Sequence, residues 1–506
     1  MVFLDGDSLA LSELLAIADD YPPVGLSPRA RNRVDAARAV VDDKAAGDEA
    51  VYGINTGFGA LAETRIPREA LGALQLNLLR SHAAGVGDLL PVRAVRASMV
   101  LRANVLAKGY SGIRRSTLDL LIELINRRVH PRVPSRGSVG ASGDLAPLAH
   151  LSLVLIGEGE ATIGDDSTVL PGRDALRRAG LEPATLMPKE GLALINGTQP
   201  STAVAALALL GSERLARAAD IAAALSIDAL RGSARPFDAR IHAARPHPGQ
   251  QLSAANISAL LAGSAINQSH EHCGRVQDAY SLRCAAQTHG AARDALAFAR
   301  ATLTTEMNGA TDNPMVFADD GDIVSGGNFH GAPVAIAADL LVIALAQLVN
   351  ISERRSDRLV DPSLSDLPAF LTPDSGLHSG YMLAQVTAAA LASEIKTLAH
   401  PASVDTIPTS ANREDHVSMS MGAALKAERA LELATRVVAV EILCACQAID
   451  LLAPLTTSAA LGRVHARVRS MVRRLAGDRP PAPDIEAISK MIAEGSLEAA
   501  CAMEVK

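Results

Sequence analysis

The spacing of apolar residues along the chain predicts a protein built mainly from helices. In a series of long segments, apolar residues recur every three to four positions, the period of a helix with one buried face. These segments cover residues 200–228, 251–265, 285–305, 331–356, 379–399 and 422–453. Several are longer than an ordinary helix, which is typical of a bundle of long helices. We therefore expect a central long-helix bundle over residues 201–478.

The first 200 residues have a more mixed pattern. Shorter helical patterns cover residues 68–80, 92–107 and 115–128. Alternating apolar and polar residues in "EGEATIGDDSTVLPG" (158–172) predict a small hairpin. Near the other end of the chain, the prolines of "DRPPAPD" mark a linker. The sequence thus predicts a mixed N-terminal region (1–200), the central bundle (201–478) and a short C-terminal helical segment (479–506).

Polar loops interrupt the helical segments. They cover residues 234–250, 306–328, 357–378 and 401–416. Loops at the ends of long helices are where functional sites are usually built. Two glycine-rich stretches in the N-terminal region raise the same question: "YGINTGFG", which begins at Tyr52, and "GSVGASGDLAPLAH" (137–150).

Composition and charge narrow the class of protein. The chain has 506 residues, of which 48% are hydrophobic and 2% aromatic, so alanine, leucine, valine and isoleucine must form the core. A net charge of −7 without a basic stripe argues against nucleic acid as a partner. Five cysteines without a regular spacing fit a reducing compartment.

Neither targeting nor membrane insertion is predicted. The N-terminus lacks the basic region of a signal peptide. The most apolar stretch, "PVAIAADLLVIALAQLVNI" (333–351), contains Asp339, Gln347 and Asn350, which favours a buried helix over a membrane span. We expect a cytoplasmic protein with no membrane or nucleic-acid partner.

Several common kinds of site do not fit the motifs. Ser142 lies in Gly-Ala-Ser-Gly, which lacks the second spacer of the G-x-S-x-G nucleophile elbow, and no phosphate-binding or dinucleotide-binding glycine motif is present. "SHEHC" (269–273) brings together His270, His272 and Cys273, but alternate residues of a helix point apart and no second cluster completes a zinc set. We therefore predict no metal site.

Backbone chemistry is the remaining possibility for the tripeptide Ala141-Ser142-Gly143. The amide nitrogen of Gly143 can attack the Ala141 carbonyl and close a five-membered ring, and loss of two waters then leaves a methylidene-imidazolone, a strong electrophile. Small residues suit this reaction because the ring closes only in a tight bend. Asp144 could help to move protons. On composition alone, a flexible loop is the simpler explanation.

The stretch around Ser142 resembles the signature of the aromatic amino acid ammonia-lyase and aminomutase family, whose Ala-Ser-Gly tripeptide forms 4-methylidene-imidazole-5-one (MIO). The likeness extends over nearly the whole chain. It includes "YGINTGFG", "SHAAGVG", "LINGTQ", "VQDAYSLRC", "TDNP", "SGGNFHG" and "HPASVDTIPTSANREDHVSM". The resemblance implies an ammonia-lyase/fumarase-like superhelical fold, MIO made autocatalytically from Ala141, Ser142 and Gly143 without an external cofactor, and a homotetramer with shared active sites.

Two positions are similar to the members of this family that act on histidine. Ser81-His82 matches their substrate-selectivity pair, where phenylalanine lyases have Phe-Leu and bacterial tyrosine lyases His-Leu. Glu414 matches their glutamate, where phenylalanine and tyrosine lyases have glutamine. Both side chains can hydrogen-bond an imidazole ring. The resemblance therefore implies that L-histidine is converted to trans-urocanate and ammonia.

The resemblance also implies roles for individual residues. Tyr52 would be the catalytic base or its partner, which requires a lowered pKa. Asn196 and Tyr280 would contact the prosthetic carbonyl and the substrate amine, Asp144 would assist MIO formation, and Arg283 would bind the substrate carboxylate. The other implied contacts to the prosthetic group or the substrate come from Gln277, Asn328, Phe329 and Met382. The spacing of Gln277, Tyr280 and Arg283 would place them on one face of a helix.

Three departures from the histidine-type pattern keep other substrates open. Ile395 stands where asparagine is expected, Arg413 where glutamine is expected, and Thr288-His289 where an apolar pair is expected. The alternatives are a tyrosine or other aromatic ammonia-lyase, a 2,3-aminomutase, and an ergothioneine-type lyase on the same scaffold.

Overall fold

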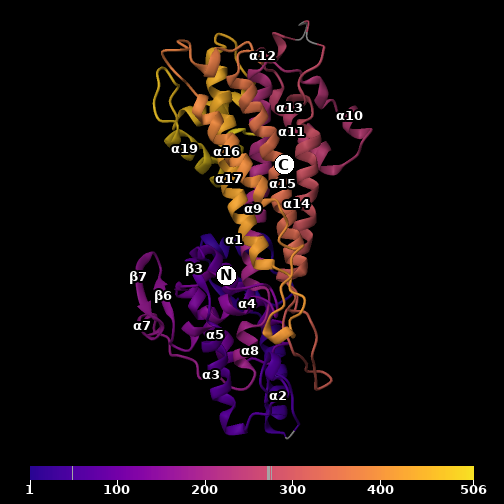
Figure 1. Ribbon diagram of the computed structural model, residues 1–506, viewed down its shortest axis with the longest axis vertical. Helices are drawn as coiled ribbons and strands as arrows, with labels where there is room; N and C mark the ends of the chain where they lie inside the picture. The colour runs from indigo at the N-terminus through magenta and orange to yellow at the C-terminus, as the bar shows by residue number, and fades with distance from the viewer. Residues whose placement is uncertain (48, 271–273, 275) are drawn as a thin grey trace. The chain divides into compact units, whose positions relative to one another are not determined.

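The computed structural model describes residues 1–47, 49–270, 274 and 276–506, and helices dominate it, as predicted (Figure 1). The chain forms two compact units. Unit 1 comprises Met1–Leu207, Arg300–Asp339 and Pro401–Leu425. Unit 2 comprises Ala208–Ala299, Leu340–His400 and Lys426–Lys506. The three-part division expected from the sequence stays a prediction.

Unit 1 combines short helices with small sheets. Its helices are α1 (Leu11–Asp19), α2 (Pro28–Ala46), α3 (Leu71–His82), α4 (Val92–Ala107), α5 (Arg115–Asn126), α6 (Leu145–Leu155), α7 (Gly172–Arg178) and α8 (Glu190–Ile195). Its strands are β1 (Val2–Leu4), β2 (Val24–Leu26), β3 (Val86–Leu89), β4 (Val129–Pro131), β5 (Pro134–Arg136), β6 (Glu160–Ile163), β7 (Asp166–Pro171), β8 (Met315–Phe317) and β9 (Asp322–Val324). β1 pairs with β2 in parallel, and the pairs β3–β5, β4–β6, β6–β7 and β8–β9 are antiparallel. The predicted hairpin is therefore confirmed as β6 and β7.

Helix α4 is almost entirely buried. Every residue from 94 to 107 is buried, including Arg96, Arg102 and Asn104. Buried cations and amides require hydrogen-bond partners, because desolvation is costly. These polar side chains therefore tie α4 to the segments around it.

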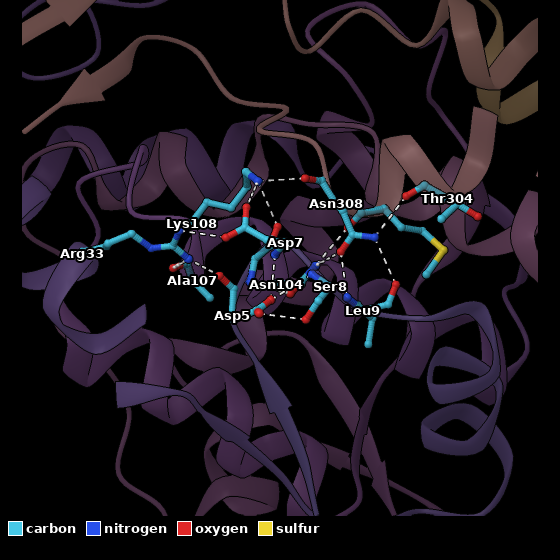
Figure 2. Close-up of polar contacts among 12 residues, drawn as sticks. Asp5, Asp7, Ser8, Leu9, Arg33, Asn104, Ala107, Lys108, Thr304 and Asn308 are labelled. Carbon is cyan, nitrogen blue, oxygen red and sulfur yellow. Dashed lines mark hydrogen bonds and ion pairs between the residues drawn. The ribbon is translucent and has the colours of Figure 1, made fainter. Parts of the chain in front are cut away.

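One such tie is a polar network at the C-terminal end of α4 (Figure 2). Asn104 accepts from the amide of Gly6 (3.0 Å) and donates to the carbonyl of Met307 (3.0 Å). Lys108 donates to the carboxylate of Asp7 (2.6 Å) and to the carbonyl of Asn308 (2.9 Å). The network joins the N-terminal segment to the end of a helix about 300 positions later in the chain.

The predicted long helices are confirmed. They are α9 (Gln199–Ala229), α11 (Pro248–Leu261), α14 (Ala285–Met307), α15 (Ala332–Val360), α16 (Met382–Leu398) and α17 (Ser420–Leu451). The shorter helices of unit 2 are α10 (Ala239–Ala243), α12 (Ala265–Gln268), α13 (Tyr280–Arg283), α18 (Ala459–Arg469), α19 (Ala482–Glu494) and α20 (Ser496–Ala500). Small residues allow close packing within unit 2: a Cβ atom on Gly211 would lie 2.4 Å from Leu431 Cδ2. By length and composition, α15 alone among the described helices could cross a membrane, but 67% of its most apolar window is buried in the fold.

Candidate active site

The tripeptide Ala141-Ser142-Gly143 forms a tight bend before α6. The backbone of Ser142 has φ +36° and that of Gly143 φ +76°, both in the left-handed region. A residue with a Cβ atom adopts this region only at an energetic cost, and such strain collects at functional sites. The bend is the conformation that attack of the Gly143 nitrogen on the Ala141 carbonyl needs.

Both ends of this loop are held by backbone contacts. On one side, Met419 N donates to Val139 O (2.8 Å) and Ser418 Oγ donates to Gly140 O (3.1 Å). On the other side, Asp144 N donates to Gly197 O (2.8 Å). The tripeptide therefore has little freedom to drift from its bend.

Asp144 lies buried at the start of α6. Its carboxylate accepts from Ser138 Oγ (2.6 Å) and from Ser201 N (2.8 Å). Burial raises the pKa of Asp144, although these hydrogen bonds oppose the shift. A carboxyl group with a raised pKa can exchange a proton closer to neutral pH, which suits the role in ring formation.

Glu414 faces the tripeptide across the site. Ser142 Oγ donates to Glu414 Oε1 (2.9 Å), while the hydroxyls of Thr409 (2.6 Å) and Ser410 (2.9 Å) donate to Oε2. A turn with φ near +50° at Ser410 and Ala411 brings these hydroxyls back onto the carboxylate. Three donors hold the carboxylate in one orientation beside Ser142.

The geometry of His82 defines its tautomer. Nδ1 lies 2.9 Å from the carbonyl oxygen of Leu78, which can only accept, so Nδ1 carries the proton and Nε2 is left as an acceptor. Burial lowers the pKa of His82, against the opposing effects of the Leu78 bond and of the Glu414 charge. His82 is therefore neutral at pH 7.

Tyr52 does not have the lowered pKa that its expected role requires. Its hydroxyl accepts from Gly59 N (3.4 Å), and its ring meets Phe58 edge-on at 6.3 Å. Burial raises the pKa of Tyr52, and the negative charge of Glu414 raises it further. A base at this position needs a cation beside it, because a nearby positive charge favours the phenolate.

The remaining predicted residues of unit 1 lie in two other segments. Asn196 is buried at the end of α8, one residue before Gly197. Asn328 and Phe329 precede α15, and Asn328 Nδ2 lies 3.5 Å from Met315 Sδ. The next residue, His330, stacks on His416 with 5.7 Å between ring centroids, which ties this segment to the one that carries Glu414.

Unit 2 holds the other predicted residues. The Arg283 guanidinium lies 4.5 Å from the ring centre of Tyr280, whose side chain is 71% exposed. A cavity of about 1050 Å³ is lined by Gln277 and Arg283 together with Arg231, Arg235 and Arg240. The arginines favour an anionic ligand group such as a carboxylate.

Two further positions in unit 2 complete the predicted set. Gln277 lies before α13, which begins at Tyr280, so the predicted single helix face is wrong: the helix makes only one turn. Met382 is the half-buried first residue of α16.

The three departures from the histidine-type pattern have different surroundings. Ile395 is fully buried in α16, whereas Arg413 is exposed. His289 is buried with its Nδ1 2.7 Å from Asp220 Oδ1, so a buried carboxylate explains the polar side chain there. Among the described residues, no cluster of three histidine, cysteine, aspartate or glutamate side chains could hold a metal ion. Of the histidine and cysteine set considered above, His272 and Cys273 lie outside the described residues.

Sequence reasoning missed several residues that shape the site. Arg102 in α4 donates to backbone carbonyls beside Asn196, and Thr409 and Ser410 orient Glu414. Arginine, threonine and serine are ordinary surface residues, and none of these three belongs to a motif with a mechanism of its own. Only the three-dimensional contacts identify them.

Comparison with known proteins identifies the family of the chain. The sequence pattern of the family described as "Aromatic amino acid lyase" matches residues 9–470. A histidine ammonia-lyase from Anaeromyxobacter sp. (strain K) is 58% identical over 504 residues, which cover 98% of this chain and 99% of the relative. The chain therefore belongs to the aromatic amino acid lyase family.

Solved structures show the same fold. The crystal structure of histidine ammonia-lyase from Trypanosoma cruzi matches with a TM-score of 0.92 and 45% identity, covering 99% of this chain and 95% of that one. Tyrosine aminomutase from Streptomyces globisporus matches with a TM-score of 0.95 and 37% identity over the full length of both chains. One scaffold thus supports different substrates and outcomes, so specificity must be argued from the site.

Proposed function

We propose that this protein is a carbon–nitrogen lyase that converts L-histidine to trans-urocanate and ammonia. The observation that carries the proposal is the contact of Ser142 with Glu414 at 2.9 Å, because it joins the tripeptide to a histidine-type residue in one site. The similarity to proteins named histidine ammonia-lyase supports the same conclusion. We further propose that it acts in the cytoplasm as a homotetramer.

The tripeptide fits the prosthetic group of this family. Its left-handed bend brings small residues together, and Asp144 beside it can accept and return a proton. A Cβ atom on Gly143 would lie 2.2 Å from Gly197 O, so the last position admits only glycine. Once formed from Ala141, Ser142 and Gly143, the methylidene-imidazolone supplies an electrophilic carbon for the substrate amine.

The ring of the substrate would be held by acceptors. His82 Nε2 and the Glu414 carboxylate both accept hydrogen bonds, so they favour a ring that brings N–H donors. A phenyl ring would offer no donor to His82 Nε2 or to the free acceptor positions of Glu414, at a cost of roughly 1–3 kcal/mol for an acceptor left unsatisfied. This favours imidazole over phenyl.

Tyr52 is proposed as the group that removes the β-proton of the substrate. Burial and the charge of Glu414 raise its pKa, so the tyrosine becomes a competent base when a cationic group lies beside it. The substrate ammonium is such a group. Arg283 would bind the substrate carboxylate, and in the proposed tetramer it comes from a different subunit than Ser142.

The test is to mix the purified protein with L-histidine and follow urocanate by its ultraviolet absorbance. We expect urocanate from the wild type and none from Ser142→Ala, with Ser135→Ala as a matched control outside the tripeptide. Glu414→Gln should retain the dehydrated tripeptide and lose most activity on histidine. Absence of urocanate, together with product from L-tyrosine or ergothioneine or a β-amino acid product, would contradict the proposal and favour one of the related activities.

A further inference from the structure

We propose that Arg102 is a positioning residue for formation of the prosthetic group, because its guanidinium holds the backbone at Asn196–Gly197 against the tripeptide. The inference rests on the proposed function, since it assumes that Ala141, Ser142 and Gly143 cyclise. Arg102 does not touch the reacting atoms, and it acts through Gly197.

Arg102 reaches from α4 to the end of α8. Its Nη1 donates to Asn196 O (2.5 Å) and to Gln199 Oε1 (2.7 Å), and its Nη2 donates to Ala193 O (2.6 Å). Gln199 in turn donates to Thr311 Oγ1 (2.6 Å). Arg102 is fully buried, and burial lowers its pKa to about 10, so it remains a cation at neutral pH. Charged hydrogen bonds in such surroundings are strong and fix geometry.

Gly197 transmits this contact to the tripeptide. A Cβ atom on Gly197 would lie 2.6 Å from Arg102 Nη1 and 2.5 Å from Thr311 O. On its other side, Gly197 O accepts from Asp144 N (2.8 Å), and the backbones of Gly143 and Gly197 form a bridge. Arg102, Gly197 and Gly143 are therefore packed in direct succession, so a shift of the Gly197 backbone would be passed on to Gly143.

The position of Gly143 matters because of the bond that it must form. Its amide nitrogen adds to the carbonyl carbon of Ala141, and the former carbonyl oxygen leaves as water with the amide protons of Gly143 and Ser142. The Ser142 hydroxyl then leaves as a second water with the Ser142 Cα proton, so the sequence involves no oxidation or reduction. Ring closure of this kind depends steeply on the approach of the two reacting atoms.

The chain offers a matched control on the same helix. Arg96 is also buried in α4 and also donates to two backbone carbonyls, those of Ile17 (3.0 Å) and Ile125 (3.1 Å). Arg96 holds α1 and α5, and neither of its carbonyl partners neighbours Gly197, whereas Arg102 holds Asn196, the residue directly before Gly197. Asn104 and Lys108 anchor the C-terminal end of α4 independently of both arginines (Figure 2).

The experiment follows dehydration of the tripeptide by mass spectrometry of the full-length soluble chain during cell-free synthesis. Arg102→Met and Arg102→Lys are compared with Arg96→Met and Arg96→Lys, and urocanate formation is normalised to the dehydrated fraction. We expect Arg102→Met to slow the loss of the two waters roughly tenfold or more, since misplacing reacting groups by about 1 Å can cost 100-fold. Arg102→Lys should be intermediate, because one ammonium cannot reproduce the fork.

The outcomes separate this inference from the proposed function. In the Arg102 variants the rate of dehydration should fall by a larger factor than the activity for each dehydrated tripeptide, and the Arg96 variants should dehydrate at the wild-type rate. Wild-type dehydration in the Arg102 variants, or equal slowing in the Arg96 variants, would overturn the inference. Should Arg102→Met be insoluble, Gln199→Met must still slow dehydration, because it removes one acceptor and leaves the cation in place. A wild type without dehydrated tripeptide would instead contradict the proposed function.

Discussion

Each half of α4 carries a buried arginine that donates to backbone carbonyls, but the two arginines have different roles. In the N-terminal half, Arg96 donates to carbonyls at the ends of α1 and α5, and its guanidinium lies 4.2 Å from the ring centre of Tyr21. In the C-terminal half, Arg102 donates to carbonyls in and after α8, directly behind the tripeptide. Both arginines are buried. The carbonyls that each one holds, and not its burial, determine whether it serves the fold or the site.

The surroundings of the two arginines differ in how closely glycine backbone is packed. Both arginines have non-glycine residues with positive φ nearby, Ser142 and Lys189 near Arg102 and Tyr21 and Arg128 near Arg96. Near Arg102, Gly143 and Gly197 in addition admit no Cβ atom. A strained backbone persists only where the surrounding structure over-determines it. We infer that the C-terminal half of α4 helps to position the atoms of the tripeptide for ring closure, whereas the N-terminal half contributes to the stability of the fold.

Of the proposed changes, Gly197→Ala should show most strongly that the C-terminal half of α4 supports the tripeptide while the N-terminal half supports stability. At φ +144° its Cβ atom would press on Arg102 Nη1, Gln199 Oε1 and Thr311 O, and the strain should cost about 1–3 kcal/mol before the contacts are counted. We expect soluble protein to accumulate with an undehydrated tripeptide and with urocanate formation reduced roughly 100-fold or more. Mass spectrometry and the urocanate assay measure both.

A suitable control for this change is Gly180→Ala. Gly180 also has positive φ, but no atom lies within 4 Å of its Cβ position. The Gly180→Ala variant should lose about 1 kcal/mol of stability, because alanine is unfavourable in a left-handed backbone. The fraction of chains with a dehydrated tripeptide should equal that of the wild type. Equal dehydration in Gly197→Ala and Gly180→Ala would refute the role assigned to the close packing behind the tripeptide.

The change Arg96→Met should affect stability and leave the site intact. It removes two charged hydrogen bonds, worth about 1.5–3 kcal/mol each. Loss of the repulsion between Arg96 and Arg128, whose guanidinium also lies against Tyr21 (4.3 Å), offsets part of this cost. We expect the apparent free energy of unfolding to fall by roughly 2–3 kcal/mol, measured by urea denaturation with circular dichroism. A large loss of dehydrated tripeptide in soluble Arg96→Met would contradict the division of roles.

The comparison also shows how far the sequence can be read. The helix predicted over residues 92–107 is observed as Val92–Ala107, because apolar periodicity reports which residues share a buried face. The same periodicity does not show which arginines of this helix are buried and which lie at the surface. Arg93 pairs with Asp19 at the surface, whereas Arg96 and Arg102 are buried, and the partners that decide this come from distant segments.

The residues of the candidate site can be predicted only from the resemblance of the sequence to the ammonia-lyase family. Ser142 and Glu414 are 272 positions apart, and no spacing rule joins them. The small residues make the tripeptide conspicuous, but on composition alone a flexible loop is the simpler explanation. The raised pKa of Tyr52 was missed because it depends on burial and on the charge of Glu414, which are properties of the folded chain.

The smallest expected effect concerns His130, beside Arg96. Burial and, to a smaller extent, the charges of Arg96 and Arg128 together lower the pKa of His130 to about 4, while Asp165 opposes them. In the unfolded chain the pKa is about 6.5, so between pH 6.5 and 4 the unfolded state binds more protons. The free energy of unfolding should therefore fall as the pH falls from 6.5 to 4, and at neutral pH His130 causes no such loss.

The change His130→Leu should remove that part of the acid sensitivity. Among the described residues, neither ring nitrogen of His130 has a hydrogen-bond partner, so an apolar side chain of similar size forfeits no bond there. We expect the variant to gain roughly 1–2 kcal/mol on the wild type at pH 4.5 and little at pH 7.5, a value reduced for solvent screening. Urea denaturation at the two pH values measures the difference. In the Arg96→Met background the gain in stability from His130→Leu at pH 4.5 should shrink, because one of the cations that keep His130 neutral is gone. A gain that is independent of both pH and Arg96 would show that packing, and not charge, determines the stability of the N-terminal half of α4.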